Sequence, residues 1–169
     1  MVERRCFEDV EVGAALPALH KGPLTTAHLM RWSAAIENWH KIHYDQAFTL
    51  EHENLPGLLV NGTLKQQFIL QSLTEWAGSD GWVWKVSFQF RAMDIVNDEL
   101  TIWATVAGKR EGVRFGLVDV ELGIRNLQGK ESTPGTAVIA LPYRSGAPVP
   151  YPFVAPEGDN VQPASGRRQ

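Results

Sequence analysis

The sequence predicts an α+β domain in which a curled antiparallel sheet wraps around one long buried helix. Two observations carry this prediction. Residues 63–77 are apolar over most of a helical surface, which is typical of a helix that is surrounded by other structure. After residue 81 the apolar period changes to two over four successive stretches, which indicates strands joined by turns. A sheet of this kind leaves an edge strand exposed, with which a second molecule can pair.

Length and composition fit a single soluble domain. The chain has 169 residues, of which 44% are hydrophobic and 21% are charged, and its formal net charge is −3. This small negative charge gives no electrostatic reason to expect nucleic acid binding. The single cysteine excludes an internal disulfide. The first residues lack the apolar stretch of a secretory signal, and no apolar run is long enough to span a membrane. We therefore expect a cytoplasmic protein that binds neither nucleic acid nor a membrane.

The first third of the chain is predicted to be short elements. These are a turn at Gly13, a strand over 17–22, a helix over 26–37 and a short helix over 45–53. Either Thr25 or Thr26 can cap the first of these helices, because a threonine oxygen accepts a hydrogen bond from a free N–H of the first turn.

Four strands are predicted after the long helix. They cover residues 82–90, 100–107, 113–125 and 135–141. In the first, one face is expected to carry Trp82, Trp84, Val86, Phe88 and Phe90. In the third, the apolar phase shifts between Leu117 and Val118, which predicts a bulge or a strong bend. Residues 142–169 hold six of the ten prolines, so we expect a domain over 1–142 and a tail over 143–169, extended along the body or disordered.

Most side chains that can do chemistry lie between residues 38 and 62, in a polar segment between two helices. They include Asn38, His40, His43, Tyr44 and Asp45. A purely structural interpretation is available, in which Asn38 ends a helix in the left-handed conformation and His43 bonds Asp45 to stiffen a loop. Zinc fits poorly, because neither His40 nor His43 has a cysteine or carboxylate at metal-site spacing. No metal is predicted.

The same residues also permit acid–base catalysis. His43 has an ordinary pKa near neutrality, and Asn38 can orient a water molecule against its ring. Gly62 begins the buried helix, so its N–H can stabilise a developing oxyanion. A base, a water and an oxyanion donor together can add water to an α,β-unsaturated carbonyl, or remove it. Neither a Gly-x-Ser-x-Gly motif nor a Gly-rich nucleotide loop is present, and no cofactor is predicted.

The chain resembles the MaoC-like dehydratase and (R)-specific enoyl-CoA hydratase family, which has the hot-dog fold. The resemblance spans residues 7–142. The family motif Asp-x-Asn-Pro-aliphatic-His-x-Asp is matched by Asn-Trp-His-Lys-Ile-His-Tyr-Asp at 38–45, and its Pro-x-aliphatic-His-Gly segment by residues 56–62. The resemblance implies a single hot-dog domain in which His43 is the catalytic histidine and the Gly62 amide binds the thioester oxygen.

Two departures from the family motif matter for the site. Asn38 stands where the family has its catalytic aspartate, and Asn61 stands where it has a histidine. The motif of this chain resembles that of a branch of the superfamily with fumarate-type or mesaconyl-CoA and β-hydroxyacyl-thioester hydratases, in which the asparagine is usual, and this resemblance implies that His43 does more of the acid–base work. The residues expected to bind substrate are His40, Tyr44, Leu59, Val60 and Asn61.

The resemblance implies a hydro-lyase that acts on an enoyl- or 3-hydroxyacyl thioester of CoA or of a carrier protein. The missing carboxylate supports a second hypothesis, a non-catalytic thioester-binding subunit that works with a partner. A hot-dog thioesterase fits the motif less well. The resemblance also implies a homodimer, or a heterodimer with another hot-dog protein. The six tryptophans leave two interpretations open, a broad acyl pocket or core and dimer interface.

Overall fold

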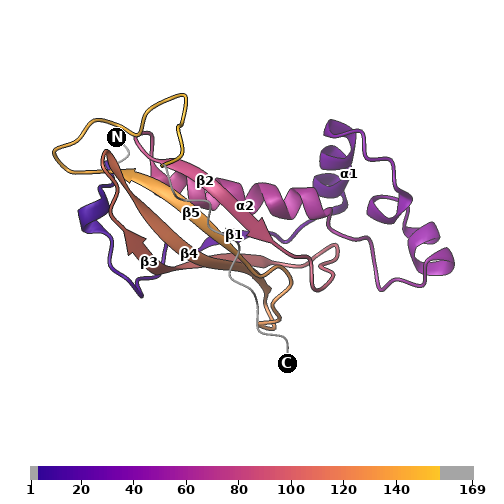
Figure 1. Ribbon diagram of the computed structural model, residues 1–169. Coiled ribbons are helices and arrows are strands. Elements are labelled where there is room, and N and C mark those ends of the chain that lie inside the picture. The colour runs from indigo at the N-terminus through magenta and orange to yellow at the C-terminus, as the bar shows by residue number, and fades with distance from the viewer. Residues whose placement is uncertain (1–3, 157–169) are drawn as a thin grey trace.

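The arrangement of sheet and helix agrees with the prediction. In the computed structural model, which describes residues 4–156, a five-stranded antiparallel sheet curls around α2 (Gly62–Ala77) (Figure 1). The strands are β1 (Leu19–Lys21), β2 (Trp82–Phe88), β3 (Leu100–Arg110), β4 (Phe115–Asn126) and β5 (Gly135–Pro142). Their order in the sheet is β1-β3-β4-β5-β2, so β1 and β2 are the edge strands. The main core lies between the sheet and α2.

Helix α2 buries a wide face, as expected, but that face is not wholly apolar. Leu64, Phe68 and Ile69 belong to the core cluster. Lys65 and Ser72 are also buried on this helix, and the apolar pattern did not predict either. The helix ends at Gly78, whose positive φ of 71° is a conformation that glycine adopts without steric cost.

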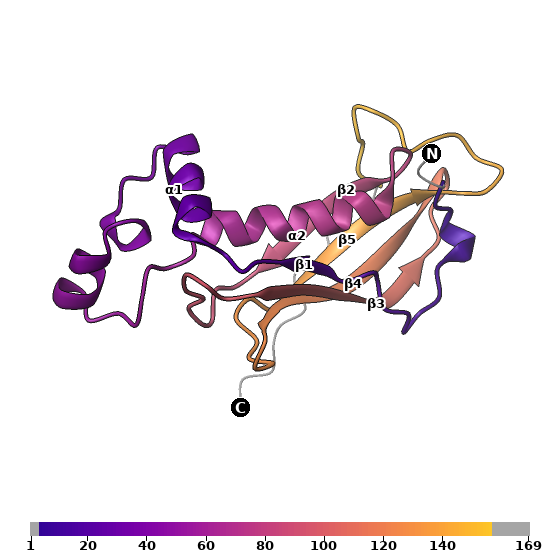
Figure 2. The ribbon, with the colours of Figure 1, turned by 180° about the vertical axis from the view of Figure 1, so that it is seen from behind.

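Residues 26–61 project beyond the sheet, at the end of the molecule where α2 begins (Figures 1 and 2). The projecting segment contains α1 (Thr26–Ala35) and two short helical turns, η2 (Lys41–His43) and η3 (Phe48–His52). Thr25 caps α1 in a capping box with His28. The left-handed residue after α1 is Glu37, with φ 53°, and Asn38 follows it and donates its N–H to Ser33 O at 2.9 Å. The helix-ending role considered for Asn38 therefore belongs to Glu37.

The alternation predicted for residues 82–90 is wrong. β2 ends at Phe88, and its pairing with β5 shifts register between Val83 and Lys85. Because of this irregularity, Val83 and Val86 pack on the core under α2, whereas Trp84 packs on the opposite, outer face of the sheet.

The bulge predicted between Leu117 and Val118 is also misplaced. The pairing of β4 with β5 runs through both residues without a break, and the nearest irregularity lies in β3, between Val106 and Gly108. Leu117 and Val118 are both apolar because both faces of the sheet are covered here. Val118 packs in the core under α2, and Leu117 packs in a second cluster on the outer face.

The outer cluster is covered by the segment that follows β5. The ring of Phe153 lies 6.1 Å from that of Trp82, and 5.6 Å from those of Trp84 and Phe115. Residues 143–156 thus lie along the body of the domain, whereas the rest of the expected tail, 157–169, is outside the described residues.

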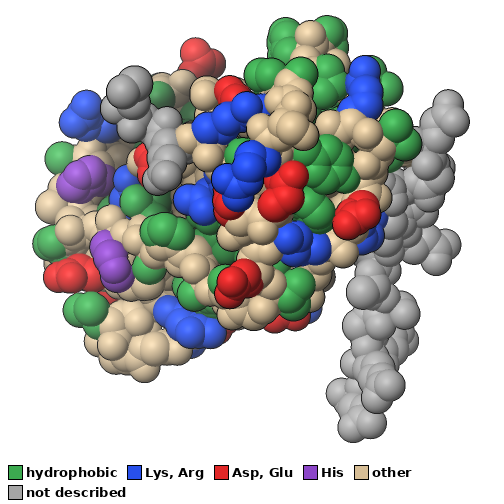
Figure 3. Space-filling view, turned by 90° about the vertical axis from the view of Figure 1, so that its left-hand side faces the viewer, with side chains coloured by type: hydrophobic (Ala, Val, Ile, Leu, Met, Phe, Trp, Pro, Cys, Tyr) green, Lys and Arg blue, Asp and Glu red, His purple; other side chains and the backbone are tan. Residues whose placement is uncertain are grey.

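On the face at the left of Figure 1, acidic and basic side chains are interspersed, with no large area of one sign (Figure 3). No helix among residues 4–156 is long and apolar enough to cross a membrane.

Candidate functional site

The predicted site residues lie where the projecting segment meets the start of α2. Three stretches that are far apart in sequence run side by side there: residues 42–43, 58–60 and 92–96. Leu59 N–H donates to Ile42 O at 2.9 Å on one side, and Val60 N–H donates to Asp94 O at 2.9 Å on the other. An antiparallel bridge between Leu59 and Ile95 also joins the stretches 58–60 and 92–96. These main-chain bonds fix the position of His43 relative to the segment that leads into Gly62.

His43 is buried, and its ring orientation is fixed by one hydrogen bond. Its Nδ1 lies 2.9 Å from Leu59 O, and only 8% of the residue is exposed. A carbonyl oxygen can only accept, so Nδ1 carries the proton and the neutral ring leaves the lone pair on Nε2. Among residues 4–156 the ring has no second hydrogen-bond partner, which leaves Nε2 available to accept a proton.

The surroundings keep this imidazole neutral. Burial lowers the pKa of His43 below its ordinary value of 6.5, the hydrogen bond to Leu59 O opposes that shift, and the nearby His40 ring adds to it. The two ring centroids are 6.2 Å apart. A neutral ring at pH 7 is the form that a general base requires.

Gly62 is the first residue of α2. The N–H groups of Gly62 and Thr63 have no acceptor within residues 4–156, as is usual in the first turn of a helix, and the side chain of Asn61 does not cap the helix. A Cβ at Gly62 would lie 2.7 Å from the ring of Phe90, so the absence of a side chain allows that ring to pack on the backbone. This helix start is therefore able to donate hydrogen bonds to an anion.

Asn61 faces α1 rather than the first turn of α2. It is 1% exposed, and its amide exchanges two long hydrogen bonds with Ser33 Oγ, at 3.3 and 3.5 Å. Beside it, Trp32 Nε1 donates to Thr63 Oγ1 at 2.9 Å. Together these bonds attach α1 to the beginning of α2.

The remaining predicted residues lie in the loop around η2. Asn38 Oδ1 accepts a hydrogen bond from His40 N–H at 3.2 Å, which leaves its amide NH₂ as a donor. Tyr44 donates its hydroxyl proton to Trp39 O at 2.7 Å. Asp45 accepts from Phe48 N–H, at the first residue of η3, at 3.0 Å, and the bond between Asp45 and His43 considered in the structural interpretation is not formed, because the ring bonds Leu59 instead.

Leu59 and Val60 contribute mainly through their backbone. Leu59 provides both main-chain contacts to the stretch that carries His43, as described above. The side chain of Val60 belongs to the core and is 6% exposed.

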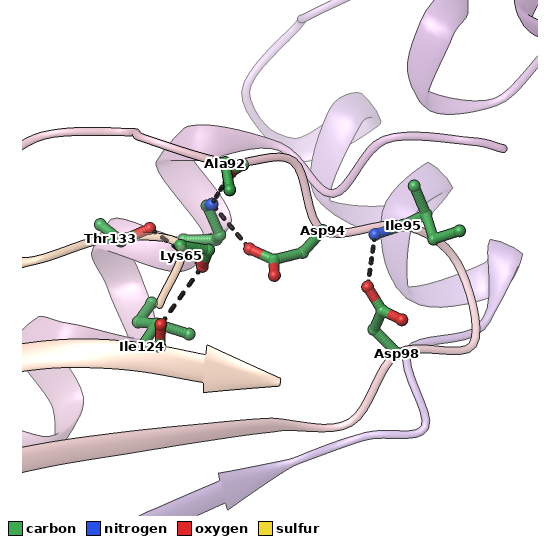
Figure 4. Close-up of polar contacts among 8 residues, drawn as sticks. Lys65, Ala92, Asp94, Ile95, Asp98, Ile124 and Thr133 are labelled. Carbon is green, nitrogen blue, oxygen red and sulfur yellow. Dashed lines mark hydrogen bonds and ion pairs between the residues drawn. The ribbon is translucent and has the colours of Figure 1, made fainter. Parts of the chain in front are cut away.

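Sequence reasoning missed a buried ion pair beneath the site. Lys65 Nζ lies 2.7 Å from Asp94 Oδ2, and the two residues are 3% and 2% exposed (Figure 4). The only signal in the sequence was a lysine within an apolar helix, and a lysine ordinarily indicates a position that faces solvent. Its partner is 29 residues away in sequence, so no local pattern connects the two.

Three hollows of the described residues lie away from these groups. They lie between α1 and α2, between α2 and β2, and beside residues 154–156, and neither His43 nor Gly62 lines any of them. Among residues 4–156, no three histidine, cysteine or acidic side chains are grouped so that they could hold a metal ion.

Residues 14–98 match the family model described as hydroxyacyl-thioester dehydratase type 2. The match covers just over half of the chain and includes every residue of the site from Ser33 to Asp94. The chain belongs to this family. Hydroxyacyl-thioester dehydratases of type 2 are by their description hydro-lyases. No curated protein sequence matches the chain.

Solved structures similar to this dehydratase-family chain establish its fold. The (R)-hydratase from A. caviae involved in PHA biosynthesis is 24% identical over 80% of this chain and 99% of that one, with a TM-score of 0.70. A MaoC-like dehydratase from Rhodospirillum rubrum is 15% identical over 81% and 96%, also with a TM-score of 0.70. The ChsH1-ChsH2 complex from Mycobacterium tuberculosis contains a chain that is 19% identical over 78% and 98%, with a TM-score of 0.68. The fold is the predicted hot-dog fold.

Proposed function

We propose that the protein hydrates an enoyl thioester, or dehydrates the corresponding 3-hydroxyacyl thioester, with CoA as the carrier of the acyl group. The observation that carries the proposal is the hydrogen bond from His43 Nδ1 to Leu59 O. It leaves a neutral imidazole with Nε2 unprotonated, and it ties that ring to Leu59, which lies three residues in sequence before Gly62 and the free N–H groups at the start of α2.

In this proposal His43 transfers the proton, Gly62 stabilises the enolate and Asn38 orients the water. Nε2 of His43 accepts a proton from water as the water oxygen attacks the β-carbon of the substrate. The electrons of the carbon–carbon double bond move to the thioester oxygen, and the Gly62 N–H stabilises the resulting enolate. The imidazolium of His43 then returns its proton to the α-carbon, so the net reaction adds one water. The free amide NH₂ of Asn38 donates to the attacking water.

Absorbance of the conjugated thioester provides the test. Purified protein is incubated with enoyl-CoA substrates of increasing chain length, and loss of the absorbance shows hydration. Free CoA is measured in the same reactions. Hydration without CoA release supports the proposal, and CoA release without hydration would identify a thioesterase instead.

A second candidate is a non-catalytic thioester-binding subunit. Two observations favour it: Asn38 replaces the carboxylate of the family motif, and a similar chain belongs to the ChsH1-ChsH2 complex. Tight binding of CoA thioesters without turnover, for any chain length, would support this candidate. Turnover that is restored only by a second hot-dog protein would support it further.

Either candidate involves a second hot-dog subunit. The edge strand β2 and α2 border a hollow of about 620 Å³ lined by residues such as Leu70, Thr74 and Val83. We propose that a second copy, or another hot-dog protein, covers this side. The Thr74→Arg variant should then be smaller than the wild type by light scattering. Glu75→Arg, on a different face of α2, is the matched control and should not change the size.

A further inference from the structure

The ion pair of Lys65 and Asp94 connects two parts of the candidate site. Lys65 lies one turn after Gly62 on α2, and its Nζ contacts Asp94 Oδ2 at 2.7 Å and Ala92 O at 3.3 Å (Figure 4). The ammonium group therefore binds the loop after β2 at two points, one in the main chain and one in a side chain.

The pair is expected to contribute little net free energy to folding, so stability alone does not explain it. Both residues are almost completely buried, and the desolvation of two charges offsets much of their attraction. Asp94 Oδ1 is buried as well and has no hydrogen-bond donor within residues 4–156. A half-satisfied buried carboxylate is costly, and apolar side chains of similar size fill such a space at a lower free energy.

The loop that Lys65 holds also positions His43. Asp94 O accepts from Val60 N–H at 2.9 Å, and Leu58 O accepts from Val96 N–H at 2.8 Å. These two hydrogen bonds hold residues 58–60 in place, and Leu59 in this stretch provides the carbonyl that orients the His43 ring.

The same lysine lies beside the proposed oxyanion donor. Phe90 packs on the backbone of Gly62, and Lys65 Nζ lies 5.2 Å from the centre of the Phe90 ring. One buried cation therefore contacts both the loop that is bonded to residues 58–60 and the ring that covers the start of α2.

We propose that Lys65 and Asp94 form a positioning pair that fixes Nε2 of His43 relative to the N–H of Gly62. The inference rests on the proposed function for its catalytic consequence. Neither residue is assigned contact with the substrate. Their effect is on geometry, and a displacement of about 1 Å between reacting groups can lower a rate by about 100-fold.

The test replaces the pair with apolar side chains. In the Lys65→Met/Asp94→Val double variant no charge is left unpaired, so the urea midpoint should stay close to that of the wild type. We expect kcat for hydration to fall at least about tenfold, with a much smaller change in KM, because only the geometry of the reacting groups is altered. The control is Arg4→Met/Asp80→Val, which removes a partly exposed ion pair near the other end of α2 and should leave kcat unchanged.

A second readout does not require turnover. In ¹⁵N NMR spectra the wild-type His43 ring should show a protonated, hydrogen-bonded Nδ1, and the double variant should lose that signature. A double variant with the midpoint, the kcat and the ring signal of the wild type would overturn the proposed positioning role. If the wild type turns over no thioester, the proposed function fails, and the ring signal still decides whether the pair positions His43. If the double variant does not fold, Lys65→Leu/Asp94→Ala, a smaller apolar pair, is measured in the same way.

Discussion

Substitution of His43 by two different amides separates its two proposed roles. In the His43→Asn variant, the side-chain NH₂ takes the place of Nδ1 and can still donate to Leu59 O, but no group replaces Nε2. In the His43→Gln variant the amide reaches the position of Nε2, and Leu59 O loses its donor. The two variants therefore remove different atoms of the same ring.

The expected magnitudes differ accordingly. Loss of a general base lowers kcat by roughly 10²–10⁴-fold, so we expect a loss of that size in His43→Asn with little change in KM. Because it retains the donor to Leu59 O, His43→Asn should be the more stable variant, by about 1 kcal/mol, which is the usual net value of one hydrogen bond.

Two assays check these values: hydration of an enoyl-CoA, followed by absorbance, and urea unfolding of both variants. A His43→Asn variant that keeps more than about a tenth of the wild-type rate would refute the base assignment. Equal stabilities of the two variants would refute the role of the bond to Leu59.

Three further predictions follow from single contacts. Gly62→Ala should require the exposed ring of Phe90 to move and should change stability by less than about 1 kcal/mol, while lowering kcat more than the His40→Ala variant does, as measured by unfolding and absorbance assays. Burial lowers the pKa of His43, so the unfolded state takes up this proton first as pH falls. The stability that neutral His43 contributes above pH 6.5 should therefore decline as the pH falls below 6.5, and urea unfolding at pH 8 to 5 should show no such decline for His43→Asn. Phe153→Ala should lower the unfolding free energy by about 1–2 kcal/mol and change tryptophan fluorescence, since the ring packs on Trp84; unchanged fluorescence would contradict that packing.

The fold was predictable because its main signals are local. In residues 63–77 and in the stretches with a period of two after residue 81, most side chains are apolar where they face the core and polar where they face solvent. This pattern can be read from neighbouring residues in the sequence. The errors arose where a second layer covers the sheet. Trp84 and Leu117 are apolar because the segment around Phe153 packs on them, which a one-sided pattern cannot represent.

The site was only partly predictable. The spacing of His43 and Gly62 was visible in the sequence, and the structure joins their segments through Leu59. Lys65 and Asp94 were not recognised, because a buried charge is explained only by its partner and that partner belongs to a different element. Substrate binding by Asn61 stays a prediction, whereas its hydrogen bonds to Ser33 were not predictable because they depend on how α1 is placed on α2.

The three adjacent stretches around Leu59 also have a consequence for biogenesis. Residues 42–43, 58–60 and 92–96 are bonded in sequence order, so a nascent chain lacks the last of them until translation has passed both α2 and β2. Helices α1 and α2 can form from local contacts well before that moment. Refolding followed by far-ultraviolet circular dichroism should therefore recover helical signal earlier than catalytic competence.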